Sequence, residues 1–148
     1  MTIPKRIAKA RADYAAGDYE NALIQAVIAV AATSKKRYPK LLDRERFVRF
    51  LQDDLYSKGL GNIRVLGGGM SVMWQRRPMA LEEVLYRSVR NSLFHEGEFP
   101  DDVVLVDSAG LLIAYEADKV CISRGAIEAF VHIVMTAPEN ARLQWIAQ

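Results

Sequence analysis

The segment from Asp18 to about Lys35 constrains the fold more than any other part of the chain. Asp18 is a good helix N-cap, and the residues after it predict a helix whose apolar side chains cover most of its circumference. Its apolar members are Leu23, Ile24, Ala26, Val27, Ile28, Val30 and Ala31. A helix that is apolar on most sides is stable in water only when other elements cover it, so we expect it to be central and buried.

Apolar residues at helical spacing predict further helices around this one. The expected helices run from Ile7 to Ala16 with an end at Gly17, from a cap at Asp43 to about Tyr56, from Met79 to about His95, and from a cap at Ser123 to about Thr136. In the second of these, one face carries Phe47, Phe50, Leu51 and Leu55. A final turn or two is expected to place Trp145 on the body of the domain.

Two stretches interrupt the helical pattern. Residues 58–78 are rich in glycine, Ile63 and Val65 alternate like a short strand, and Pro78 suits the first turn of the fourth helix. Val103–Val106 and Leu111–Tyr115 predict a hairpin, with Lys119–Ile122 as a third short strand. We therefore predict a mostly α fold, a bundle of four to five helices with a small β-hairpin insertion, in a single domain over residues 1–148.

Composition excludes several classes of protein. The chain has 148 residues, 51% of them hydrophobic and 26% charged, with a net charge of +2, which is typical of a globular protein and only mildly basic. Its one cysteine, Cys121, excludes a disulfide framework within the chain and a cysteine-rich zinc site. Neither a signal peptide nor a bilayer-spanning run of about 20 apolar residues is visible. We expect a cytoplasmic protein without membrane segments.

The most informative motif lies on the expected fourth helix. Arg87, Asn91 and His95 are spaced i, i+4 and i+8, opposite an apolar side, and Arg90 flanks the row they form. Arginine binds phosphate bidentately, and histidine moves protons near neutral pH. Because Arg90 and His95 lie roughly 140° apart around the helix, they can share one phosphate only if a second surface closes over them. The motif predicts metal-independent phosphate-ester chemistry, with no cofactor.

Other basic and histidine residues have competing interpretations. Residues 35–40 contain four basic side chains around Tyr38 that are able to contact a nucleic-acid backbone, and Arg76 and Arg77 are further candidates for phosphate contacts. Such runs are more often simply solvated. His132, four residues after Glu128, is expected to be a partly buried side chain rather than a metal ligand.

Over Arg90-Asn91-Ser92-Leu93-Phe94-His95 the chain resembles the HEPN superfamily, whose motif is Arg, four to six residues, then His, often with a polar residue after the Arg. The order of helices is also similar. The resemblance implies a helical bundle that dimerises so that two motifs face each other, as in metal-independent endoribonucleases of toxin–antitoxin or phage-defence systems. Arg90 and His95 would then be catalytic, with Asn91 supporting them, and the partners would be RNA and a cognate antitoxin protein.

A second hypothesis is a non-catalytic nucleotide-binding or protein-interaction module of the same type. In that case Arg87 and Arg90 pair with carboxylates, for which Glu96 and Glu98 lie close in the sequence. The chain also departs from a plain bundle at residues 58–78 and 103–115, and both segments are able to cover the groove that an RNA would need.

Overall fold

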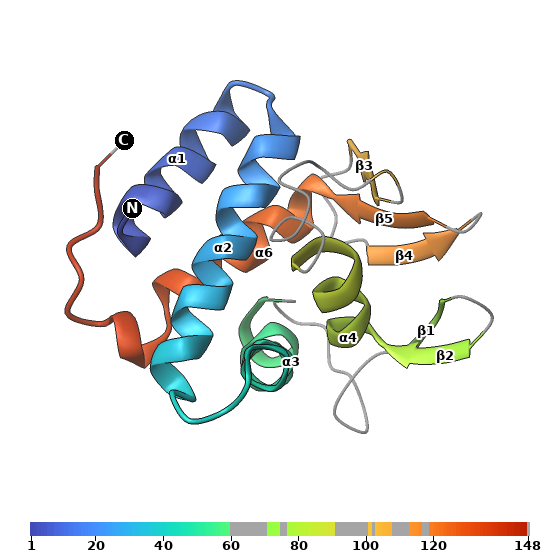
Figure 1. Cartoon of the computed structure of the whole chain (residues 1–148). Helices are drawn as coiled ribbons and strands as arrows, with labels where there is room; N and C mark the ends of the chain where they lie inside the picture. Colours follow the sequence, from blue (N-terminus) through green and yellow to red (C-terminus); the bar gives the residue numbers. More distant parts are fainter. Residues whose placement is uncertain are drawn as a thin grey trace.

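The central element of the fold is helix α2 (Tyr19–Arg37), onto which α1 (Ile3–Ala15), α3 (Asp43–Asp54) and α6 (Arg124–Met135) pack. This computed structural model describes residues 1–59, 71–74, 77–90, 101, 103–107, 113–116 and 119–147. Figure 1 shows the helices gathered on one side and two small sheets on the other, with α4 (Leu81–Leu85) between them. The predicted mostly helical fold with a small β insertion is confirmed.

Helix α2 is buried as predicted. Nine of its residues are buried, and the Asp18 carboxylate accepts a hydrogen bond from the Asn21 amide at 3.2 Å, which confirms the expected N-cap. Helix α1 begins earlier than the expected Ile7, because Pro4 belongs to its first turn and Thr2 caps it. It ends where predicted, at Gly17, whose φ of 80° is a left-handed conformation that glycine adopts without strain.

Helix α3 carries the expected apolar face, and all four predicted residues are buried. Its N-cap is Leu42, not Asp43 as predicted. Asp43 lies in the first helical turn instead, where its carboxylate receives hydrogen bonds from other side chains. After Asp54 the chain continues into a π-helical turn, η1 (Leu55–Gly59).

The first sheet is an antiparallel hairpin of β1 (Ser71–Trp74) and β2 (Arg77–Ala80). The predicted start of the fourth helix at Pro78 is wrong, because Pro78 lies in β2 opposite Met73. Proline is tolerated there because each strand of a two-stranded sheet is an edge strand. The helical segment begins at Leu81 with α4 and continues as a π-helical turn, η2 (Tyr86–Arg90). The strand expected around Ile63 and Val65 lies outside the described residues.

The second sheet has the order β3-β5-β4, formed by β3 (Val103–Val106), β4 (Ile113–Glu116) and β5 (Lys119–Ser123). The predicted pairing of the first two strands is therefore wrong: β5 lies between them, parallel to β3 and antiparallel to β4. Val120 and Ile122 are almost fully buried, which suits β5 to the middle position.

Helix α6 begins as predicted. The Ser123 hydroxyl accepts a hydrogen bond from the Ala126 amide at 3.3 Å and so caps the helix. The helix ends at Met135, and Pro138 opens a short 3₁₀ turn, η3 (Pro138–Asn140). Beyond this turn, Trp145 packs against the core, as expected.

Candidate functional site

The predicted site residues divide into those that the structure describes and those that it does not. Arg87 and Arg90 lie on η2, and Arg77 lies exposed on β2. The other three predicted residues, Asn91, His95 and Arg76, lie outside the described residues. The described part of the site therefore centres on Arg87 and Arg90.

Arg90 is tied to the start of α3. Its guanidinium Nη2 lies 3.4 Å from Oδ1 of Asp43, and Arg46 reaches the same oxygen at 3.3 Å. The other oxygen of Asp43 accepts a hydrogen bond from the Tyr86 hydroxyl at 3.1 Å. Burial and the Asp43 carboxylate raise the pKa of Tyr86, so this hydroxyl remains a donor at neutral pH.

A second carboxylate, Glu83, is shared by two further arginines. Arg44 donates from Nε to the buried Glu83 carboxylate at 2.7 Å, and Arg87 donates to the same oxygen at 3.3 Å. The Arg44 and Arg87 side chains are 54% and 45% exposed, whereas that of Arg90 is only 15% exposed. The guanidinium groups of Arg44 and Arg87 are thus held by Glu83, while about half of each side chain is exposed to solvent.

We call Arg44, Arg46, Arg87 and Arg90 the arginine cluster. The Asp43 carboxylate pairs with Arg46 and Arg90, and the Glu83 carboxylate pairs with Arg44 and Arg87, so each of these two carboxylates is shared by two guanidinium groups. The neighbouring carboxylate of Glu82 is buried and accepts hydrogen bonds from the uncharged side chains of Gln52 and Tyr56. Several guanidinium groups held close together, two of them on partly exposed side chains, are an arrangement that favours an anionic ligand such as phosphate.

The sequence interpretation missed both carboxylates of this site. The pair of Glu83 and Arg87 was visible in the sequence, since an i, i+4 spacing brings two helical side chains together. The contact between Asp43 and Arg90 was not, because 47 residues separate the two. Pairing of Arg87 and Arg90 with carboxylates is found among the described residues, where Glu83 and Asp43 are partners; Glu96 and Glu98 lie outside the described residues.

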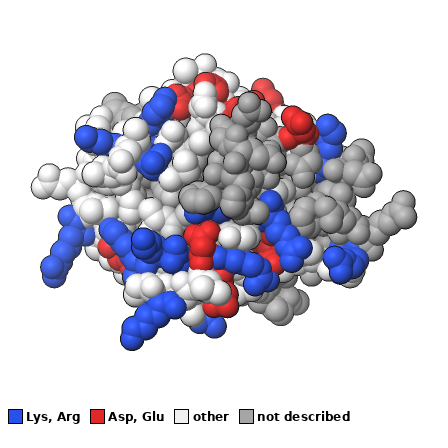
Figure 2. Space-filling view, in the orientation of Figure 1, with Lys and Arg blue, Asp and Glu red and all other residues white. Residues whose placement is uncertain are grey.

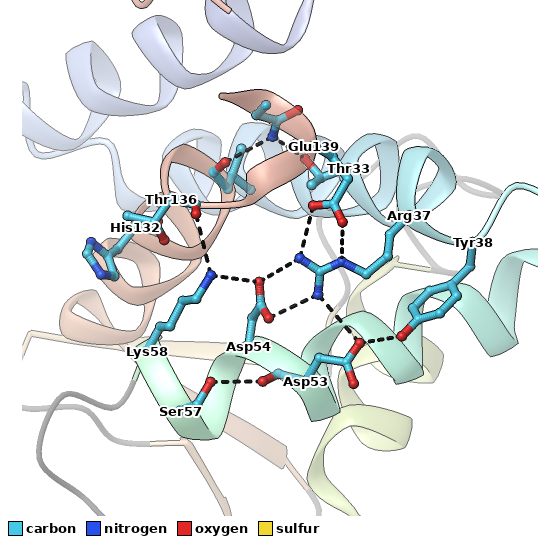
Figure 3. A network of polar contacts seen from close by, with 12 residues as sticks. Thr33, Arg37, Tyr38, Asp53, Asp54, Ser57, Lys58, His132, Thr136 and Glu139 are labelled. Atoms are coloured by element: carbon cyan, nitrogen blue, oxygen red, sulfur yellow. Dashed lines mark hydrogen bonds and ion pairs between the residues drawn. The ribbon is translucent and has the colours of Figure 1, made fainter. Parts of the chain in front are cut away.

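Basic side chains also gather where α2 ends and α3 begins, over the lower part of the face in Figure 2. Arg37, one of the four expected to contact nucleic acid, is engaged within the protein (Figure 3). Its guanidinium binds the Asp54 carboxylate at 2.9 and 3.0 Å and the Glu139 carboxylate at 2.7 and 3.0 Å, and it lies over the ring of Phe50. Arg37 therefore ties α2, α3 and the segment after α6 together rather than offering itself to a phosphate.

The pairing with Arg37 lowers the pKa of Glu139. A carboxyl group with a lowered folded-state pKa stabilises the fold above its ordinary pKa of 4.5, and this stability is lost as the pH falls through the lowered value. We expect Glu139→Gln to reduce the unfolding free energy at pH 7 and to make a smaller difference at pH 2. Urea unfolding of both proteins at the two pH values measures this, and a gap of equal size at both would contradict it.

His132 lies exposed on α6, not partly buried as expected, and its ring points away from the Arg37 network (Figure 3). Within the described part of the chain, no group of three or more His, Cys, Asp or Glu side chains is placed to hold a metal ion. No helix in the described ranges is both long and apolar enough to cross a membrane.

A model of the Rv1289 family matches residues 2–146. No curated protein and no solved structure matches the chain significantly. The description of this family names no activity. Because the match spans nearly the whole sequence, the chain belongs to the Rv1289 family.

Proposed function

We propose that the arginine cluster binds the phosphate backbone of RNA, and that the chain cleaves this RNA as a metal-independent endoribonuclease of HEPN type. The observation that carries the proposal is the gathering of four guanidinium groups in the arginine cluster, with the side chains of Arg44 and Arg87 about half exposed. Phosphate contacts by arginine supply most of the affinity of proteins for nucleic acid. The resemblance of Arg90-Asn91-x-x-x-His95 to the HEPN motif supplies the catalytic part.

In this reaction the ribose 2′-oxygen attacks the adjacent phosphorus. The 2′-oxygen loses its proton, a new bond forms between it and phosphorus, and the bond from phosphorus to the 5′-oxygen breaks as that oxygen gains a proton. His95 takes part in one of the two proton transfers, and Arg90 stabilises the charge on the non-bridging oxygens, with Asn91 orienting either group. The nucleophile belongs to the substrate, so the protein needs only to position groups and move protons.

The HEPN resemblance extends the proposal to the setting of the protein. It suggests a cytoplasmic homodimer in which two motifs face each other across one groove. The dimer would supply the second surface that Arg90 and His95 need in order to share one phosphate. A role as a toxin controlled by an antitoxin, or in phage defence, belongs to the same proposal.

A second candidate is a non-catalytic module of the same type that binds a nucleotide or a partner protein. The observation that favours it is that Arg90 and Arg87 are already paired with Asp43 and Glu83. In that case Arg90 holds η2 against α3, and the exposed Arg44 and Arg87 bind an anionic group without chemistry.

RNA affinity and its salt dependence test the site that both candidates share. We expect Arg44→Gln and Arg87→Gln each to weaken binding of a single-stranded RNA oligonucleotide. Each should also make the negative slope of log affinity against log salt shallower by about 0.7, because one phosphate contact is lost. Fluorescence anisotropy over a range of salt concentrations measures both effects.

The matched control is Arg142→Gln, which removes an equal charge from an exposed position after η3. It should leave the salt slope unchanged. Equal slopes for all three variants and the parent protein would exclude the cluster as the phosphate site. Absence of RNA binding by the parent protein would exclude the function itself.

A further inference from the structure

Helices α1 and α6 both pack against α2 and leave a groove of about 440 Å³ between them. This volume lies within the roughly 300–1,000 Å³ that is typical of small-molecule sites. The apolar part of its lining is a row on α6, Ile127, Val131 and Met135, which faces Ala10 of α1. Ile127 and Ala10 are buried, so the floor of the groove is apolar and well packed.

The polar lining of the groove carries charges of both signs. Arg11 projects from α1, and Glu128 and His132 form an i, i+4 row on α6, so that a cation and an anion stand on opposite walls. Arg11 and Glu128 are both exposed, and neither forms an ion pair with any described residue. The groove therefore presents two separate charged groups above an apolar floor.

Tyr14 completes the polar lining. Its hydroxyl is buried, and burial raises the pKa of Tyr14, so the group stays protonated at neutral pH. Arg124 and Glu128 act on this hydroxyl, so Tyr14 lies beside the carboxylate wall of the groove. A small-molecule site usually consists of an apolar surface with a small number of precisely placed polar groups.

We propose that this groove binds a zwitterionic small molecule of the α-amino-acid class with an apolar side chain. The carboxylate of the ligand pairs with Arg11, its ammonium group pairs with Glu128, and its side chain lies on the row of Ile127, Val131 and Met135. A ligand with a single charge would pair with either Arg11 or Glu128 and be repelled by the other of these two residues. The site is separate from the arginine cluster, and the proposal does not depend on RNA binding.

The experiment uses three probes that differ by one charged group: L-leucine, L-leucinamide, which lacks the carboxylate, and 4-methylpentanoate, which lacks the ammonium group. Isothermal titration calorimetry on the full chain measures their affinities. We expect L-leucine to bind at least about tenfold tighter than either analogue, since a hydrogen bond to a charged group is lost in each. Methyl NMR should place the bound side chain at Val131 and Met135.

Two variants assign each charge to its wall. Arg11→Gln should abolish the preference for L-leucine over the amide while keeping the preference over 4-methylpentanoate, and Glu128→Gln should do the reverse. Lys5→Gln on α1 and Glu20→Gln on α2 remove equal exposed charges away from the groove and should preserve both preferences. The proposal is overturned if L-leucine does not bind saturably, if it binds no better than its analogues, or if the preferences survive in both groove variants.

Discussion

The largest effect is expected from His95→Ala, which should slow RNA cleavage by at least about a hundredfold while leaving the fold and RNA binding intact. The reason is that general acid–base catalysis contributes typically 10²–10⁴-fold, and the variant removes the imidazole that moves a proton in the proposed reaction. We expect binding to persist because, in the proposed function, the arginine cluster and not His95 supplies the affinity for phosphate. Single-turnover cleavage of a labelled RNA measures the rate, and anisotropy measures the binding.

The chain offers a matched control, since its one other histidine, His132, lies exposed on α6. His132→Ala should cleave at the parent rate. Equal cleavage by His95→Ala and the parent protein would end the nuclease proposal. A parent protein that binds RNA through the cluster but does not cleave it would establish the non-catalytic alternative.

The second large effect is on stability and comes from Arg37→Met. This change removes the guanidinium that binds both Asp54 and Glu139, while the Asp54 side chain is only 7% exposed. Breaking a buried pair by removing one partner leaves an uncompensated charge, and we expect the unfolding free energy to fall by about 3 kcal/mol. Lys58 approaches Asp54 at 3.5 Å and compensates only in part. Urea denaturation with linear extrapolation measures the loss.

The control for this variant is Lys35→Met, an exposed lysine on the same helix, which should change stability by no more than about 0.5 kcal/mol. Adding Asp54→Asn to Arg37→Met should recover part of the lost stability, because the orphaned charge is removed with its partner. If Arg37→Met were as stable as Lys35→Met, the network in Figure 3 would not hold these three segments together.

Local signals account for the parts of the fold that were predicted correctly. The apolar circumference of α2, the caps at Asp18 and Ser123 and the buried face of α3 all depend on residues within a few positions of one another. Such patterns are visible in one sequence, because helical periodicity and capping are short-range effects.

The errors arose where a local signal competed with a distant partner. Pro78 suits a helix start, but pairing with β1 places it in a strand. Two consecutive strand-like runs suggest a hairpin, but β5 inserts between them and makes a parallel pair with β3. Strand order depends on which buried side chains meet in the core, and that is a property of the whole domain.

The site shows the same division at the level of single residues. The sequence by itself determined that Arg87 and Arg90 lie on a helical segment, and that Glu83 stands one turn before Arg87. Only the tertiary structure decided that Asp43 on α3 pairs with Arg90, and that Arg44 on α3 shares the Glu83 carboxylate with Arg87. Helical spacing acts through the backbone of one segment, whereas an ion pair between two helices exists only once the core has brought them together.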